Sequence, residues 1–168
     1  KYYNNGVNGV YFKKDKITNL FDYIYIFDKL SRNNIPYIIP FDSKITNQNR
    51  EIYAKAYRIE YLFSEIDDEL LELVKNNNIS LNFSISKMLE LNYNLDIYEF
   101  IYTLIKDNYN VIINSGDMTI LNTDIINEYC LLVNNCSLTL LELVKLLINS
   151  INHLNINEEE NKEIAMSK

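Results

Sequence analysis

The sequence predicts an α/β fold in which parallel strands alternate with helices. Short apolar runs of strand length recur along the chain, and between them lie longer segments whose apolar residues have helical spacing. This order repeats five times, which is typical of parallel strands joined by crossover helices. With 168 residues, 48% of them hydrophobic, the chain is long enough for a single domain, residues 1–168, with a real core.

The elements follow from these patterns in order along the chain. The expected strands are "GVYF" (9–12), "YIIPF" (37–41), "YRIEYL" (57–62), "ISLNF" (79–83) and "NVIIN" (110–114). The expected helices are residues 19–32, 48–56, 67–77, 95–108 and 138–151.

Several helix starts have recognisable signals. Thr18 or Asn19 precedes the first helix, and Asp67 begins the third, where a carboxylate interacts favourably with the helix dipole. Ser137, with Glu142 close behind it, predicts the start of the last helix. The abundance of Asn, Ile, Lys and Tyr indicates a bias toward A/T-rich codons, so an asparagine run such as 76–78 is interpreted as carrying little information.

Charge and composition exclude several classes of function. The net charge of −7 and the pI near 4.8 leave no basic face for nucleic acid or for an anionic membrane. No apolar run approaches the roughly 18 residues of a membrane-spanning helix, and no signal peptide opens the chain. Cys130 and Cys136 lie in one expected helix and its following turn, which favours a reduced, cytoplasmic protein over a disulfide framework.

Polar residues stand where the expected strands end, which is where ligands bind in α/β sheets and barrels. Read in order, these strand ends resemble those of the adenosine and AMP deaminases, which are metal-dependent (β/α)8-barrel hydrolases. The family's fourth strand reads G-[IV]-D-L-x-G-x-E, and "GVYFKKDK" (9–16) keeps its Gly9. The family's fifth strand ends in H-A-G-E, and "NIPYIIPFDS" (34–43) has Pro40 at the metal-binding His and Ser43 at the catalytic Glu.

The remaining strand ends continue the resemblance. The sixth strand's R-[IL]-G-H-G corresponds to "RIEYL" (58–62), in which Tyr61 stands at the catalytic His. The last strand's N-T-D-D-P corresponds to "NSGDM" (114–118), in which Gly116 replaces the metal-binding Asp while Asp117 remains. Residues 124–164 are similar to the family's terminal helices, and the "ELVKLLINS" segment leans toward the AMP deaminases.

The resemblance implies the C-terminal part of a (β/α)8 barrel, with five parallel strands equivalent to strands four to eight. The strands that carry the family's H-x-H metal motif are missing from this chain. Because five parallel strands cannot close an eight-stranded barrel, we expect the missing N-terminal half, or a protein partner, to complete it.

The resemblance also shapes the functional hypotheses. Zinc ligands and a carboxylate base are absent at the positions of Pro40, Gly116 and Ser43, so no cofactor is expected and the leading hypothesis is a catalytically inactive deaminase-like pseudoenzyme. It would act as a scaffold, a partner subunit or a nucleoside-binding or nucleotide-binding module. The alternative is a purine deaminase or other hydrolase that uses zinc with Asp42, Tyr61 and Asp117 in new roles. A third hypothesis is an α/β interaction domain unrelated to deaminases.

Individual residues carry both structural and functional interpretations. Gly9 and Asp117 are the candidate ligand-binding residues, although Asp117 is also expected to cap the next helix. Arg58 is expected to be a structural ion-pair partner beside Glu60. His153, the only histidine, is expected to face solvent or to cap the last helix.

Overall fold

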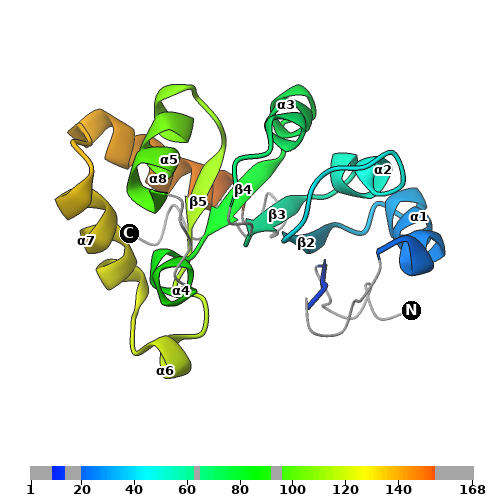
Figure 1. The fold of residues 1–168 in the computed structure, drawn as a ribbon, viewed down its shortest axis with the longest axis horizontal. Coiled ribbons are helices and arrows are strands. Elements are labelled where there is room, and N and C mark those ends of the chain that lie inside the picture. Colours follow the sequence, from blue (N-terminus) through cyan, green and yellow to red (C-terminus); the bar gives the residue numbers. More distant parts are fainter. Residues whose placement is uncertain (1–8, 14–19, 63–64, 92–95, 154–168) are drawn as a thin grey trace, which may run out of the picture.

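The computed structural model describes residues 9–13, 20–62, 65–91 and 96–153. Five parallel strands form one sheet in the order β1-β2-β3-β4-β5, and helices connect each strand to the next (Figure 1). The strands are β1 (Val10–Tyr11), β2 (Tyr37–Phe41), β3 (Arg58–Tyr61), β4 (Ser80–Phe83) and β5 (Val111–Ile113). The helices are η3 (Leu20–Tyr23), α1 (Ile24–Arg32), α2 (Arg50–Ala54), α3 (Asp68–Asn76), α4 (Ile85–Glu90), α5 (Ile97–Lys106), α6 (Met118–Leu121), α7 (Ile125–Asn135) and α8 (Leu140–Asn152).

The predicted α/β fold with five parallel strands is confirmed. In the described part of the chain, β1 and β5 are the two edges of the sheet, so these strands form an open arc. Neighbouring strands are also consecutive in sequence. Each crossover therefore places the next strand on the same side of the one before it, as in a (β/α)8 barrel.

The two faces of the sheet differ in character. Side chains alternate along a strand, and the register aligns Phe41, Tyr61, Phe83 and Ile113 on the face that packs against the helices. Tyr61 is fully buried there, in contact with Phe100 of α5 at 5.1 Å between ring centroids. The opposite face, here called the inner face, carries polar residues instead, among them Arg58, Glu60, Ser80 and Asn82.

Helix starts are set by side-chain caps. Asp67 accepts the N–H of Leu70 at 2.8 Å, as the sequence predicts for the third helix. The prediction that Ser137 begins the last helix is wrong, because Thr139 is the N-cap and forms a capping box with Glu142. Thr18 and Asn19 lie outside the described residues. The helix α4 was not predicted, because six residues are too few to show a helical period, and α6 was anticipated only through Asp117 as the cap of the next helix.

Helix ends use asparagine where other proteins often use glycine. Asn34, Asn78, Asn108 and Asn122 all have positive φ angles between 47° and 58°, and each follows the last residue of a helix by one or two positions. Asparagine tolerates this left-handed conformation better than other residues that have a Cβ. The interpretation of the 76–78 run as uninformative is therefore wrong, since α3 ends at Asn76 and Asn78 makes the left-handed turn that follows it.

Candidate functional site

The site that the sequence predicts lies at the carboxyl ends of the strands. Pro40 lies in β2 and pairs in register with Glu60 of β3, which pairs in turn with Asn82 of β4. These three residues therefore form a row across the inner face, near the ends of their strands. Ser43 follows β2 and is exposed.

An ionic cluster occupies the middle of this row. The carboxylate of Glu60, 6% exposed as a residue, lies 2.8 Å from Lys87 Nζ of α4 and accepts the hydroxyl of Tyr11 from β1. Two strands and a helix thus meet at one buried carboxylate, whose charge is compensated by the ammonium group. The sequence interpretation that pairs Glu60 with Arg58 is wrong: both residues lie on the inner face, but the Glu60 carboxylate pairs with Lys87 Nζ of α4 at 2.8 Å.

Tyr61 does not face this row. It follows Glu60 by one position, so its ring points to the helix side, and its hydroxyl donates to the carbonyl of Glu65 at 2.6 Å. The residue that stands at the family's catalytic His is thus part of the aromatic core. Glu60 was missed as a site residue, although the polar-apolar alternation of Arg58-Ile59-Glu60-Tyr61 already assigns Glu60 and Tyr61 to opposite faces.

Gly116 and Asp117 lie in the loop after β5. Gly116 has φ +58°, and its N–H donates to Asn114 Oδ1 at 2.7 Å. A Cβ added at Gly116 would lie 2.7 Å from Ser84 Oγ, which is too close for any side chain without movement. Asp117 accepts the N–H of Ile120 at 3.2 Å and caps α6, so the predicted capping role is confirmed.

Zinc is the metal that the fold family implies, and the residues at the family's metal positions do not fit it. Pro40 offers no donor side chain, and Gly116 has neither a donor nor the space for one. Among the residues that the structure describes, no three His, Cys, Asp or Glu side chains come together as a metal site.

The inner face also carries polar atoms without partners. Within the described part of the chain, four buried side-chain atoms form no hydrogen bond: Arg58 Nε, Ser80 Oγ, Asn82 Oδ1 and Ser84 Oγ. Buried polar atoms are normally paired, so these positions are suited to form hydrogen bonds with a ligand or with another polypeptide segment, with Arg58 Nε as a donor and Asn82 Oδ1 as an acceptor. Asn82 and Ser84 lie toward the carboxyl ends of the strands, whereas Arg58 and Ser80 begin theirs.

A hollow opens at the amino ends of the strands. It has a volume of about 310 Å³ and is lined by Gly9, Tyr57 and Arg58, among others. Burial lowers the pKa of the Arg58 guanidinium, and it also lowers the pKa of His153, whose ring lies 6.2 Å from that of Tyr57. His153 is the C-cap of α8, which confirms the capping role expected for it.

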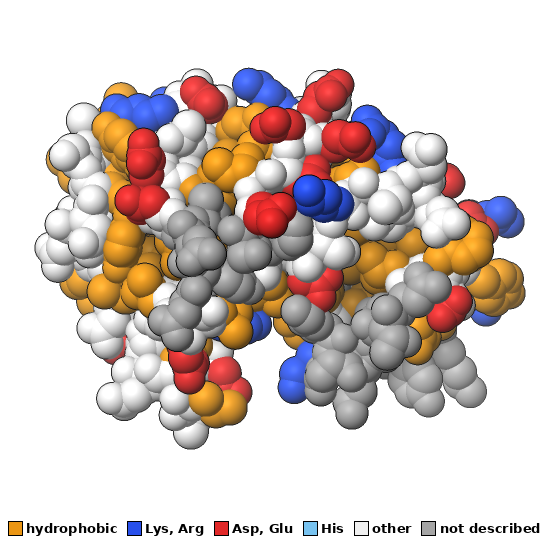
Figure 2. Space-filling view, in the orientation of Figure 1, with side chains coloured by type: hydrophobic (Ala, Val, Ile, Leu, Met, Phe, Trp, Pro, Cys, Tyr) orange, Lys and Arg blue, Asp and Glu red, His pale blue; other side chains and the backbone are white. Residues whose placement is uncertain are grey.

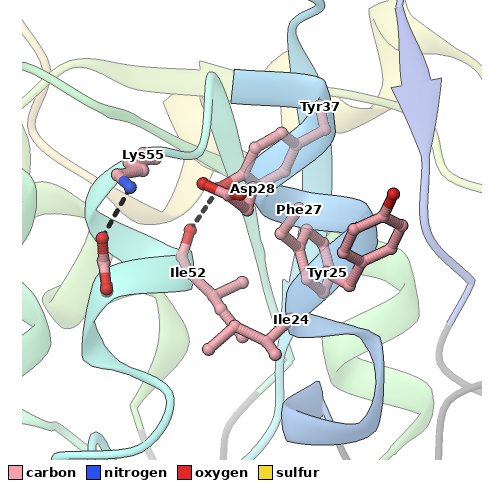
Figure 3. A pocket seen from close by; sticks show the side chains of 8 residues that line it. Ile24, Tyr25, Phe27, Asp28, Tyr37, Ile52 and Lys55 are labelled. Carbon is pink, nitrogen blue, oxygen red and sulfur yellow. Dashed lines mark hydrogen bonds and ion pairs between the residues drawn. The ribbon is translucent and has the colours of Figure 1, made fainter. Parts of the chain in front are cut away.

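The predicted ligand-binding residues are not brought together. Gly9 precedes β1 and lies at the amino-end hollow, whereas Asp117 lies beyond the carboxyl end of β5. Another hollow, of about 300 Å³, lies between α1 and α2 and is lined by neither Gly9 nor Asp117 (Figure 3). Its walls include Tyr37, whose hydroxyl donates to the carbonyl of Ile52, and Lys55, which is paired with Glu51.

Two general findings concern the chain as a whole. Both cysteines are free thiols, with Cys130 exposed and Cys136 buried. Among the helices in the described ranges, none has the combination of length and apolar content that crossing a bilayer requires.

Comparisons with known proteins give matches at the level of structure. No protein-family model matches the sequence, and no curated protein matches it either. Arabidopsis ADAL complexed with GMP superposes with a TM-score of 0.83 at 15% identity, covering 98% of this chain and 50% of that one. Arabidopsis ADAL complexed with IMP gives a TM-score of 0.80 at 17% identity, over 96% and 48% of the two chains.

The apo N6-methyl-AMP deaminase from Arabidopsis thaliana gives a TM-score of 0.80 at 15% identity. The superposition covers 96% of this chain and 49% of that enzyme. The chain therefore spans about half the length of the solved structures that it matches. The predicted resemblance is confirmed in the fold: this chain has the architecture of about half of an AMP deaminase-like (β/α)8 barrel.

Proposed function

We propose that this chain is part of a deaminase-like barrel that binds a purine nucleoside or nucleotide without deaminating it. The fold supports this proposal, since Arabidopsis ADAL has the same architecture and has been solved in complex with GMP and with IMP. The five described strands supply one wall of such a binding site, along the carboxyl ends of β2 to β5.

The single observation that carries the proposal is the packing of Gly116 against Ser84. A simple loss of one metal ligand could be reversed by one substitution. Here the backbone at Gly116 is left-handed, and Ser84 Oγ occupies the space that a Cβ would need. The left-handed backbone and the neighbouring Ser84 side chain both disfavour a carboxylate at this position, which supports a role other than metal-dependent hydrolysis.

The other changed positions support the same proposal. Ser43 is exposed and carries a hydroxyl where a carboxylate base would act. Tyr61 is held in the core by three aromatic neighbours and by its bond to Glu65, which leaves no group in the position of the family's His. The alternative hydrolase with Asp42, Tyr61 and Asp117 is disfavoured, because Asp117 caps α6 while Tyr61 faces the helices.

Ligand recognition is assigned to the carboxyl-end half of the inner face. Asn82 Oδ1 is a buried acceptor and Ser84 Oγ is a buried hydroxyl, and both lack a partner in the described part of the chain. A purine ring offers N–H donors and ring-nitrogen acceptors that match them. The remaining strands of the barrel, from the N-terminal half or from a partner protein, would complete the site from the opposite side.

The test combines a binding assay with an activity assay. The protein is supplied with Zn²⁺ and incubated with adenosine and then with AMP while the purine absorbance is followed, and IMP and GMP binding is measured by calorimetry. We expect no absorbance change, measurable nucleotide binding, and a loss of about 2-fold to 10-fold in affinity for Ser84→Ala. Ser80→Ala is the matched control, because it removes a buried unpaired hydroxyl near the start of β4 and should leave binding unchanged.

Two outcomes contradict the proposal. An absorbance change that a chelator abolishes would mean that hydrolysis has been retained with other residues. Failure of both nucleotides to bind, or an equal loss for Ser84→Ala and Ser80→Ala, would remove the nucleotide site from the carboxyl ends of the strands.

A further inference from the structure

The last helix, α8, is amphipathic, but its apolar side points outward. Its inward side carries Leu146, which is buried, together with Glu142 and Ser150. Glu142 pairs with Lys106 of α5 at 2.6 Å, and Ser150 lies 3.3 Å from the hydroxyl of Tyr129 in α7. A surface helix ordinarily buries its apolar stripe and exposes its polar one, so this arrangement is the reverse of the usual one.

The outward side is defined by six residues, here called the outer stripe: Leu140, Leu141, Val144, Leu147, Ile148 and Ile151. Their exposed fractions run from 40% for Val144 to 77% for Leu140. Four of them, at positions 140, 144, 147 and 151, follow the alternating spacing of four and three residues that forms a seam between two packed helices. The outer stripe therefore has the pattern of a helix-packing surface.

A groove between α7 and α8 extends this surface. It has a volume of about 450 Å³, and its walls include Ile126, Tyr129, Cys130, Val133, Leu143 and Leu147. Leu147 belongs to both the groove and the outer stripe, so the two are continuous. Hydrophobic side chains also reach the surface on the left of the space-filling view, where the ribbon shows α7 (Figures 1 and 2). An exposed apolar surface of this extent marks an interaction site.

The position of the surface indicates what covers it. Both α7 and α8 follow β5 and pack against it, and β5 is an edge of the described sheet. In a closed (β/α)8 barrel the last strand pairs with the first, and the helices after those two strands lie side by side. The chain spans about half the length of the barrels that it matches, so the half it lacks would begin next to α8.

We propose that the outer stripe and the α7-α8 groove bind the first helices of the N-terminal barrel half. The occupant is a β/α segment whose strand extends the sheet from β5 and whose amphipathic helix packs along α8. This inference rests on one part of the proposed function, that a second half completes the barrel, and it does not require that the barrel binds a nucleotide. It identifies the surface through which the two halves associate.

The experiment uses the exposed thiol in the groove as a reporter. The chain is expressed alone and together with a tagged probe, which is the half of Arabidopsis N6-methyl-AMP deaminase that this chain does not match. Co-purification and the rate of thiol labelling are then measured without nucleotide. We expect the two halves to co-purify and the labelling of Cys130 to slow at least 10-fold, while Cys136, buried in the described structure, reacts slowly in both samples.

Substitutions separate this surface from general effects. Leu147→Glu and Leu140→Glu each place a charge in the outer stripe and should prevent co-purification. Because Leu147 is 44% exposed and Leu140 is 77% exposed, both variants should fold, as circular dichroism can verify. Asn152→Glu adds the same charge to α8 outside the outer stripe and should leave co-purification intact.

Three results would overturn the inference. The first would be failure of the probe half to co-purify with the chain, and the second would be co-purification in which Cys130 remains fully reactive. Alternatively, sedimentation of the chain alone shows a dimer that Leu147→Glu converts to a monomer, which would make a second copy the occupant. Since nucleotide is absent throughout, these failures are distinguishable from failure of nucleotide binding.

Discussion

The carboxylate of Glu128 in α7 accepts the backbone N–H of Ile85, the first residue of α4, at 2.6 Å. It also accepts the N–H of Ser86 at 3.2 Å, and the Glu128 side chain is fully buried. The first N–H groups of a helix have no partners within the helix, and a negative charge there interacts favourably with the dipole. A residue from the last third of the chain thus completes the start of α4, beside Ser84 and Lys87.

This relationship predicts a large loss of stability for Glu128→Ala. The substitution leaves the N–H of Ile85 buried without an acceptor, which costs about 1–3 kcal/mol. Urea unfolding of the variant measures this loss, and Glu99→Ala on the exposed start of α5 is the control. Equal stabilities of the two variants would show that Glu128 is not the acceptor that matters.

The buried ion pair predicts a non-additive double-mutant cycle. Lys87→Met leaves the Glu60 carboxylate, 8% exposed in its side chain, with Tyr11 as its remaining partner in the cluster described above, and should cost about 1.5–3 kcal/mol. In a Glu60→Gln background the same substitution should cost much less. Identical losses in the two backgrounds, measured by chemical unfolding, would mean that the pair is not coupled.

The packing at Gly116 predicts a strained loop in Gly116→Ala. A Cβ at φ +58° is unfavourable by about 1–2 kcal/mol, and contact with Ser84 Oγ adds to this. Ser84→Ala removes the hydroxyl, so the double variant should recover part of the loss. A Gly116→Ala variant with unchanged thermal stability would argue against the strain.

The pair formed by Lys106 and Glu142 predicts a pH-dependent contribution to stability. The hydrogen bond from Lys106 lowers the pKa of the Glu142 carboxyl from 4.5 to about 2, with further bonds from Thr139. A carboxyl whose pKa is lower in the folded state stabilises the protein above the unfolded pKa, and this contribution disappears as the pH falls from about 4.5 toward 2. In Lys106→Met the pKa should rise part of the way back to 4.5, because Thr139 still donates.

An NMR titration of the Glu142 carboxyl in both proteins measures this shift directly. The acid-induced loss of stability should also be smaller in Lys106→Met. A wild-type carboxyl that titrates near 4.5 would contradict the pairing that holds α8 against α5.

The strands were predictable because each is short and has apolar residues at consecutive or alternating positions. The predicted 37–41 agrees with β2 residue for residue, and no end of the other four differs by more than one position. The short helix α4 was not predictable in this way, since its start depends on the distant residue Glu128, whereas the start of α6 was signalled by Asp117 directly before it.

The site was harder to predict than the fold, for a physical reason. The motif resemblance aligns Tyr61 with a catalytic residue. Successive side chains on a strand point to opposite faces of the sheet, however, and a shift of one position reverses the face to which a residue points. Ile59 and Tyr61 share the helix side, and Glu60 therefore faces inward. The partner of Glu60 could not be inferred, because Lys87 lies 27 residues away on a helix that has no sequence signal.

The four left-handed asparagines at the helix ends have a consequence for how such a chain can evolve. The whole chain contains only three glycines, the residue that most often adopts the left-handed conformation at a helix end. Left-handed turns are nevertheless required wherever a helix reverses toward the next strand, and asparagine satisfies that requirement from A/T-rich codons. Asparagine therefore lets the same order of strands and helices form in a chain that has very few glycines.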